Sequence, residues 1–256
     1  MCGIAGIFHM DGATPDDVKA LEAMQQSLVH RGPDGHGSFV RGAVRLTMRR
    51  LSIIDVEGGV QPINNETDTV HVVLNGEIYN FQRLRETLEA HGHRFRTHSD
   101  TETIVHAYEE WGDAFVDRLD GMFALAVWDE SRQRLLLARD RAGIKPLYFA
   151  ITGSTLVFGS ELKAVLASGY VGRDLDFQVL AHYLSLEYVP APSSILQSVK
   201  RLESGCTLVA SSSGVQTSRY WDLDLSQSEN NPVQGTIAEH AGTFYEVLRG
   251  AVKREM

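Results

Sequence analysis

The chain begins with the stretch MCGIAGIF (Met1–Phe8), in which a cysteine directly follows the initiator methionine. If Met1 is removed, Cys2 carries a thiol and a free α-amine on the same residue. An unperturbed α-amine titrates at about 7.7–8.0, so it can accept the thiol proton without a histidine partner. The alternative is a buried cysteine that happens to follow the initiator. Position alone does not separate these two interpretations, so the rest of the chain must do so.

Composition narrows the class of protein. The chain has 256 residues, 43% of them apolar, which is enough for one large core or for one core and an appendage. The net charge of −9 and the lack of a Lys/Arg-rich run argue against a nucleic-acid or anionic-membrane partner. Cys2 and Cys206 make no disulfide framework. Without a spanning apolar stretch or a signal peptide, we expect a cytoplasmic protein.

Short β-rich runs dominate the first 160 residues, and several of them are apolar on both faces, as in a sheet covered on both sides. They follow one another without regularly intervening helices, which predicts an α+β fold rather than a βαβ repeat. The predicted strands are Ile4–Phe8, Val44–Thr47, Leu51–Ile54, Val70–Leu74, Met122–Trp128, Arg134–Arg139, Leu147–Ile151 and Thr155–Phe158.

Helices are predicted from their capping residues and apolar stripes. The first begins at Thr14 before a proline, with Asp17 in its first turn. The second is capped by Asn80 and stops at Gly92. The third is capped by Ser99 or Asp100 and runs to Trp111-Gly112.

The composition changes after Trp221. Residues 222–235 are polar and contain a proline and a glycine, as is typical of a linker. Residues 236–256 then predict an amphipathic helix, with Thr236 and Glu239 forming a capping box. A single amphipathic helix needs a surface to pack on. Either it folds back on the first domain, or it is the first helix of a further domain.

A cysteine nucleophile that acts on an amide needs several polar groups around it. Asn75 and Gly76 offer an amide and a backbone N–H for the tetrahedral oxyanion. If the amide belongs to an amino acid, Arg50 suits its α-carboxylate, and Glu77 and Asp100 suit its α-ammonium. Taken singly, Asp100 is also typical of a helix cap and Arg50 of a surface or sheet-edge cation.

Eight segments together resemble one family. In order along the chain they are MCGIAGIF, HRGPDG, RRLSIID, VLNGEIYNF, HSDTE, GMFALAVWD, LLLARDRAGIKPLYFA and FGSELKAV. They resemble the glutamine-hydrolysing domain of asparagine synthetases, a class II glutamine amidotransferase with an N-terminal nucleophile, and HRGPD favours this branch. The resemblance covers residues 1–221. It implies an Ntn-hydrolase fold, a four-layer αββα sandwich with two antiparallel sheets.

The resemblance also implies roles for single residues. Cys2 would be the nucleophile, Asn75 and Gly76 the oxyanion hole, and Arg50, Glu77 and Asp100 the groups that bind glutamine. Asn75 and Gly76 would also contact the substrate. No metal and no cofactor are expected for this domain. Arg31 is predicted to be structural, and the histidines His91, His93, His98 and His106 are interpreted as structural or surface residues because convincing metal-ligand partners are lacking.

The sequence departs from the family in one large respect. Full members continue into an ATP-dependent synthetase domain with an SGG-x-DS loop, which this sequence lacks. ATP, Mg²⁺ and an aspartate or related carboxylate acceptor are therefore expected only in a complete enzyme, and 236–256 would be the first helix of the synthetase domain. A homodimer is a further expectation. In the variant turn Glu203–Cys206, Cys206 is interpreted as a buried small residue.

Two other functions remain open at this point. The chain could be a stand-alone glutaminase, or a subunit that supplies ammonia to a separate synthetase. It could instead be a non-catalytic binding module, although the six residues assigned to the site are all present together. Within the site, Arg49 and Arg50 point to opposite faces if the strand is regular, and the resemblance selects Arg50.

Overall fold

The computed structural model describes residues 1–226 and 235–255. The chain consists of two units, Met1–Tyr220 and Trp221–Met256. Most of the predicted linker, namely 227–234, lies outside the described residues.

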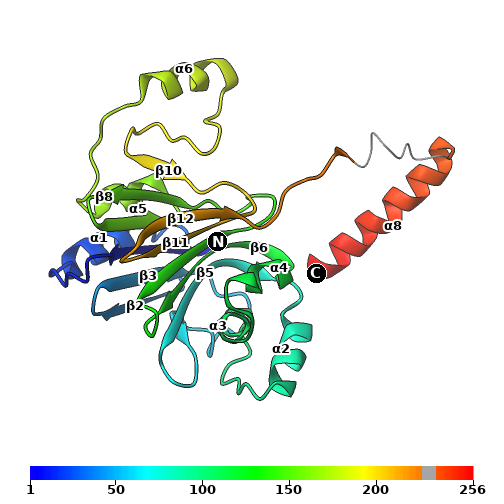
Figure 1. Cartoon of the computed structure of the whole chain (residues 1–256). Helices are drawn as coiled ribbons and strands as arrows, with labels where there is room; N and C mark the ends of the chain where they lie inside the picture. Colours follow the sequence, from blue (N-terminus) through cyan, green and yellow to red (C-terminus); the bar gives the residue numbers. More distant parts are fainter. Residues whose placement is uncertain (227–234, 256) are drawn as a thin grey trace. The chain divides into compact units, whose positions relative to one another are not determined.

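The first unit contains two antiparallel sheets, each with six strands among the described residues (Figure 1). One sheet has the order β10 (Val199–Arg201), β8 (Tyr148–Thr152), β9 (Thr155–Gly159), β1 (Gly3–His9), β3 (Val44–Arg50) and β2 (Gly35–Arg41). The other has the order β12 (Gly214–Arg219), β11 (Cys206–Ser211), β7 (Arg134–Arg139), β6 (Gly121–Asp129), β5 (Val70–Ile78) and β4 (Ile63–Asn64).

Helices cover the outer faces of both sheets. Side chains of α1 (Val18–Ser27) and α5 (Leu162–Ala167) pack on the β1 sheet, and those of α2 (Phe81–Ala90), α3 (Asp100–Trp111) and α4 (Phe115–Arg118) pack on the β5 sheet. A short 3₁₀ helix, η1 (Gly112–Ala114), joins α3 to α4, and α6 (Phe177–Leu186) projects from the β10 end (Figure 1). The predicted four-layer αββα sandwich is confirmed.

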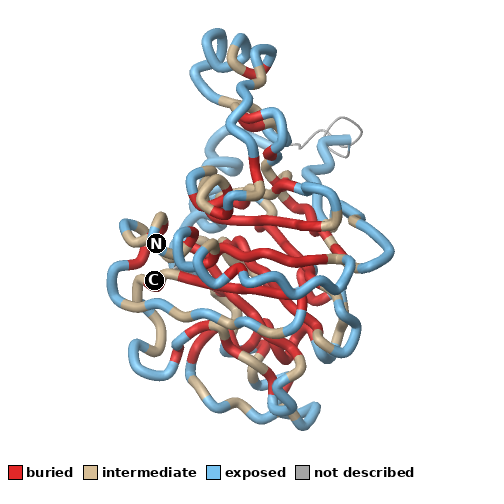
Figure 2. The backbone as a smooth tube through the Cα atoms, turned by 90° about the vertical axis from the view of Figure 1, so that its left-hand side faces the viewer, coloured by how far each residue is buried: buried red, intermediate tan, exposed pale blue. Residues whose placement is uncertain are grey.

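Strand alternation produces three separate cores, because each sheet is buried on both faces. In β6, Ala124, Ala126 and Trp128 face the core between the sheets. Phe123 and Leu125 of the same strand face the helices α2–α4. Figure 2 shows the result, with buried residues concentrated along the strands and exposed ones in the connections. Cys206 is buried in the core between the sheets, as predicted.

The strand predicted at Leu51–Ile54 is wrong. Strand β3 ends at Arg50, and the next residues form an irregular loop. The backbone groups of this loop are satisfied by side chains instead of a neighbouring strand: the N–H of Ser52 donates to Asp34 at 2.9 Å, and Arg50 binds carbonyls of residues 54–56. Ile53 is 68% exposed, so its side chain adds no burial that would favour a strand.

Two predicted helix caps also differ from the structure. Helix α1 begins at Val18 instead of near Thr14, and Asp17, predicted in its first turn, stands at the cap position with its carboxylate bound to His9 and Tyr170, each at 2.7 Å. Asn80 stands at the predicted cap position of α2, but its side chain bonds the backbone of the Arg118–Asp120 segment. In both helices the side chain at the cap position binds a distant part of the chain instead of its own helix.

Among the described residues of the second unit there is one long helix, α8 (Ile237–Glu255). Thr236 and Glu239 form the predicted capping box: the N–H of Thr236 donates to the Glu239 carboxylate at 2.7 Å, and the N–H of Glu239 donates to Thr236 Oγ1 at 3.3 Å. The surface on which this helix packs stays a prediction.

Candidate active site

A pocket in the first unit gathers polar groups from β3, β5, the loop after β3 and the N-terminus of α3. Five of the six predicted site residues line it; the sixth, Asn75, lies in β5 immediately before Gly76. The lining residues are Cys2, Arg50, Leu51, Ile53, Ile54, Gly59, Gln61, Gly76, Glu77, Ser99, Asp100 and Thr101.

Cys2 lies just before β1 and is only partly buried. Its Sγ atom is 3.4 Å from the backbone nitrogen of Leu51 and 3.6 Å from the carbonyl oxygen of the same residue. Arg31 donates from Nε to the carbonyl of Cys2 at 2.8 Å and is itself held by Glu161 at 2.9 Å. Arg31 therefore orients the first residues of the chain, which is the role predicted from the sequence.

Gly76 presents its backbone N–H to the pocket. It lies opposite Phe123 in the ladder between β5 and β6. Both the N–H and the C=O of Phe123 bond Asp140, at 3.2 and 2.8 Å. The Gly76–Phe123 pair is therefore of the non-hydrogen-bonded kind, in which the N–H of each residue points away from its partner.

The neighbouring N–H groups on this edge of β5 are occupied. Leu74 donates to Gln61 Oε1 at 2.7 Å, and Ile78 donates to Asp100 Oδ2 at 3.0 Å. The N–H of Gly76 points the same way, between these two, and β4 pairs with β5 only farther upstream. A backbone donor thus faces a pocket that also contains a thiol, which is the arrangement an oxyanion hole requires.

Packing between strands explains why residue 76 is a glycine. A Cβ atom there would lie 2.2 Å from the carbonyl oxygen of Met122 and 2.7 Å from Cα of Phe123. The close approach of β6 therefore requires a glycine at this position.

Asn75 is fully buried beside the pocket and is not among its lining residues. Its Nδ2 lies 3.5 Å from Ser160 Oγ, which accepts from the N–H of Ile4 at 3.0 Å, and its Oδ1 has no hydrogen-bond partner in the described residues. Exchanging the two amide atoms would let Ser160 donate to Oδ1 and would leave Nδ2 free to donate. A buried amide group without a hydrogen-bond partner lowers the stability of the fold, and a ligand oxygen that accepts from Nδ2 would remove this cost.

Arg50 is buried, and its guanidinium holds the loop that closes the pocket. It donates to the carbonyls of Ile54, Asp55 and Val56 at 2.9, 2.6 and 2.8 Å. Gly59 completes this cradle, since a Cβ there would lie 2.5 Å from Nη2 of Arg50. The cation therefore lies in the pocket wall with its position fixed by the loop.

Asp100 is the first residue of α3, and Ser99 is the cap. The Ser99 side chain accepts from the N–H of Thr101 at 3.2 Å, which leaves the Asp100 carboxylate free to reach β5. Burial raises the pKa of Asp100, and the nearby charge of Glu77 raises it further. The helix-cap alternative for Asp100 is therefore wrong, and two acids face the pocket together.

Two contributors were missed by the sequence analysis. Gln61 spans the pocket floor, donating to Thr101 Oγ1 at 3.1 Å while it accepts from β5. Lys145 is buried, with its Nζ 3.4 Å from Met1 Sδ, and burial followed by the charge of Arg31 lowers its pKa. No spacing rule predicts either, since Gln61 precedes a proline in a loop and Lys145 lies far along the chain.

Residues 1–221 match the model of a protein family described as a glutamine amidotransferase domain. The chain belongs to this family. The match ends at the residue after which the composition of the sequence changes.

Two curated relatives of this glutamine amidotransferase domain are named asparagine synthetases. The chain is 35% identical over 251 residues to asparagine synthetase [glutamine-hydrolyzing] 3 of Bacillus subtilis, covering 97% of this chain and 41% of that protein. It is 41% identical over 207 residues to asparagine synthetase [glutamine-hydrolyzing] 1 of the same organism, covering 80% of this chain and 33% of that protein. The chain therefore spans less than half the length of these relatives.

Solved structures confirm the fold. A glutamine phosphoribosylpyrophosphate amidotransferase from B. subtilis superimposes with a TM-score of 0.62 at 21% identity, covering 86% of this chain and 49% of that one. In the part of this chain that the structure describes, no helix is long and apolar enough to cross a bilayer.

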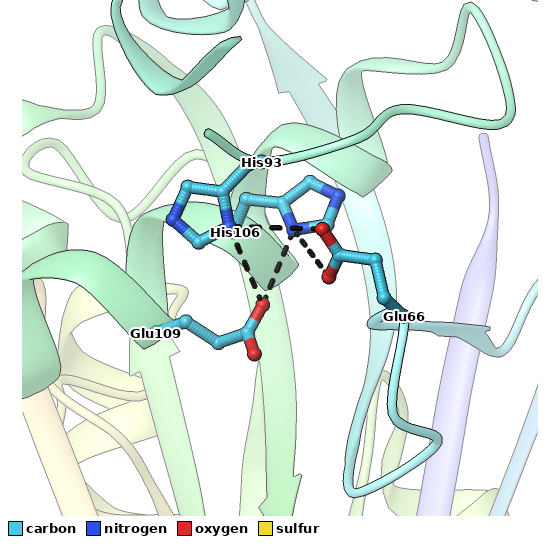
Figure 3. Close-up of side chains that lie close together, drawn as sticks. All are labelled: Glu66, His93, His106 and Glu109. Carbon is cyan, nitrogen blue, oxygen red and sulfur yellow. Dashed lines mark hydrogen bonds and ion pairs between the residues drawn. The ribbon is translucent and has the colours of Figure 1, made fainter. Parts of the chain in front are cut away.

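The interpretation of the histidines as structural or surface residues stays a prediction, although two of them have carboxylate neighbours in the fold. Away from the pocket, His93 and His106 lie with Glu66 and Glu109 in one compact group (Figure 3). These side chains come from three separate segments, so their sequence spacing did not reveal them.

Proposed function

We propose that this chain is the glutaminase portion of a glutamine-dependent enzyme of the asparagine synthetase type. The observation that carries the proposal is the pocket itself, in which Cys2, the N–H of Gly76, a buried cation and two carboxylates converge. A free amino acid that bears a side-chain amide matches each of these groups.

Recognition of glutamine would use the charged groups of the pocket. The Arg50 guanidinium would bind the α-carboxylate, and Glu77 and Asp100 would bind the α-ammonium. These contacts leave the side-chain amide directed at Cys2. The negative charge of these two carboxylates also disfavours binding of a substrate that carries no positive group.

The reaction would begin after Met1 is removed. The α-amine of Cys2 accepts the thiol proton, and the thiolate attacks the carbonyl carbon of the glutamine side chain. Gly76 N–H and the Asn75 amide donate to the resulting oxyanion. The α-ammonium of Cys2 returns its proton to the side-chain nitrogen as the tetrahedral intermediate collapses, so that the C–N bond breaks, ammonia leaves and a γ-glutamyl thioester remains on Cys2. The α-amine then accepts a proton from the water that hydrolyses the thioester to glutamate, and it returns that proton to the thiolate.

Ammonia would be consumed elsewhere in the complete enzyme. We propose ATP and Mg²⁺ as its cofactors and aspartate or a related carboxylate as the acceptor, because the named relatives are asparagine synthetases of more than twice this length. The two free cysteines suit a reducing, cytoplasmic location.

Replacing the nucleophile tests the proposal. Cys2→Ala should abolish glutamate release from glutamine, because alanine keeps the α-amine and lacks the thiol. Cys206→Ala is the matched control, since Cys206 is buried in the core between the sheets, and it should retain activity. Glutamate release that survives in Cys2→Ala would contradict the proposal.

A further inference from the structure

A group of two imidazoles and two carboxylates lies outside the pocket. Glu66 comes from the turn between β4 and β5, His93 from the connection between α2 and α3, and His106 with Glu109 from α3. One nitrogen or oxygen from each side chain lies within 4.8 Å of all the others. None of the four lines the pocket that contains Cys2.

The distances within the group match those between ligands of a tetrahedral metal ion. Both imidazoles point Nδ1 inward, as Figure 3 shows. His106 Nδ1 lies 3.2 Å from Glu109 Oε2 and 3.5 Å from Glu66 Oε2. His93 Nδ1 lies 3.8 Å from the same Glu109 oxygen and 3.9 Å from Glu66 Oε1. Ligands at 2.0–2.2 Å from a tetrahedral zinc ion are separated by about 3.3–3.6 Å. An ion could therefore be held with only small side-chain movements.

The outward-facing atoms of the two imidazoles have carboxylate partners. His106 Nε2 is buried, has no hydrogen-bond partner within the described residues, and faces Glu102 Oε1 at 3.7 Å. His93 Nε2 faces Glu110 Oε2 at 3.5 Å. A carboxylate behind a histidine fixes the ring with Nε2 protonated and Nδ1 free as a ligand.

The two carboxylates of the group are held from behind as well. Glu66 Oε1 accepts from the N–H of Arg94 at 2.9 Å, and Glu109 Oε1 accepts from Asn65 Nδ2 at 2.6 Å. In Glu109 the other oxygen, Oε2, faces the two imidazoles, and in Glu66 both oxygens lie near an imidazole nitrogen. Such support of every ligand is typical of metal centres and is not needed for a surface ion pair.

We propose that Glu66, His93, His106 and Glu109 bind one zinc ion, which joins the β4–β5 turn and the α2–α3 connection to α3. Two imidazoles and two carboxylates suit Zn²⁺ and other late first-row metals, whereas Mg²⁺ and Ca²⁺ prefer oxygen alone. With four protein ligands the site is closed, so its role is structural. Glu66, His93 and Glu109 are partly exposed, which gives the ion a path inward.

The excess of carboxylates is consistent with a cation at this position. Three carboxylates surround the buried His106 ring: Glu109 at 3.2 Å and Glu66 at 3.5 Å from Nδ1, and Glu102 at 3.7 Å from Nε2. A zinc ion bound at Nδ1 would compensate this negative charge.

Zinc titration of chelator-stripped protein tests the proposal. Zn²⁺ alone is titrated against a chromogenic zinc chelator, and bound metal is counted by mass spectrometry. We expect about one zinc per chain, retained in millimolar Mg²⁺. The His93→Gln and Glu109→Gln variants should each weaken zinc binding by at least about 10-fold. These two residues are partly exposed, so their replacement should leave the fold intact, whereas His106 is fully buried.

His91→Gln is the matched control. His91 lies two residues from His93 in the same connection and pairs with the other oxygen of Glu110, outside the group. This variant should bind zinc within about twofold of the wild type, and zinc should raise the melting temperature of both. The same addition should leave the melting temperature of His93→Gln unchanged. Zinc below one-tenth of an equivalent, equal affinity in wild type and His93→Gln, or displacement by Mg²⁺ would overturn the proposal.

Discussion

Asp100 and Glu102 lie two residues apart in the first turn of α3, yet their pKa values move in opposite directions. Burial raises the pKa of Asp100. Burial also acts on Glu102, but the neighbouring His106 ring and the hydrogen bonds from Thr97 and Arg96 outweigh it and lower the pKa to about 2. Both side chains are almost completely buried, so the difference lies in the partners that each carboxylate finds.

The Glu102 carboxylate is satisfied within the chain. It accepts from the N–H groups of Arg96 and Thr97, each at 2.7 Å, and from Thr97 Oγ1 at 2.6 Å. Asp100 accepts from the N–H of Ile78 at 3.0 Å and from Ser99 Oγ at 3.4 Å, the N–H of Thr101 also lowers its pKa, and the like charge of Glu77 lies nearby. The carboxylate that stabilises the fold thus has the shorter hydrogen bonds, while the one at the pocket has longer ones and a like charge beside it, which favours binding of a cationic ligand.

The largest expected effect concerns stability. Glu102→Gln should lower the free energy of unfolding by about 3–5 kcal/mol, because it removes the charged acceptor of the Arg96 and Thr97 N–H groups and one of the three carboxylates around His106. Urea denaturation measures this. Glu110→Gln, on the exposed part of the same helix, should cost less than about 1 kcal/mol. Equal losses in the two variants would show that the buried Glu102 carboxylate supports the fold no more than an exposed acid does.

The next effect concerns turnover. Asn75→Ala should lower kcat for glutamine hydrolysis by about 10²–10³-fold with little change in KM, because an oxyanion donor acts in the transition state. Steady-state kinetics with glutamine measures both constants. If kcat is unchanged, the unused amide group of Asn75 has a structural role and the oxyanion hole lies elsewhere.

Substrate recognition should show a smaller effect. Arg50→Lys should raise KM for glutamine by an amount equivalent to about 1.5–3 kcal/mol, because a point charge replaces a bidentate fork. Arg49 lies on the opposite face and bonds Gln25 and Gln26, so Arg49→Lys should be nearly silent. The reverse result in glutamine kinetics would place Arg49 in the pocket.

The smallest effect is a pH dependence. Since the folded-state pKa of Asp100 is raised, its carboxylate loses its charge as pH falls through that value, and KM for glutamine should rise there. Ionisation of Asp100 destabilises the fold as pH rises through the same value. Asp100→Asn should therefore be at least as stable as the wild type at neutral pH, with a raised KM that no longer changes on the acid side. A variant less stable than the wild type would show that the carboxylate supports the fold.

The fold could be predicted where residues alternate regularly or match a motif. Strand β6 could be predicted because its residues are apolar on both faces. The αββα layers could be predicted because eight segments, beginning with Met1–Phe8, resemble one family. The loop after Arg50 could not be predicted, because its apolar residues are typical of a strand. In the fold, the side chains of Arg50 and Asp34 bind its backbone instead of a neighbouring strand.

Five of the six predicted site residues line the pocket, and their roles stay predictions. The sequence alone could not show that β6 requires the glycine at position 76, or that the Asp17 carboxylate binds His9. The group around His106 could not be predicted, since its members are far apart in sequence and meet only in the folded chain. Each of these three features depends on residues that are separated in sequence and meet only in the folded chain.

The central claim is that Cys2, freed from Met1, attacks glutamine. The most direct test is to mix the protein with isotope-labelled glutamine, quench it in acid and analyse the N-terminal peptide by mass spectrometry. We predict a peptide that begins at Cys2 and carries one labelled γ-glutamyl group, absent from Cys2→Ala. Active protein that retains Met1, or a labelled group found elsewhere in the chain, would contradict the account.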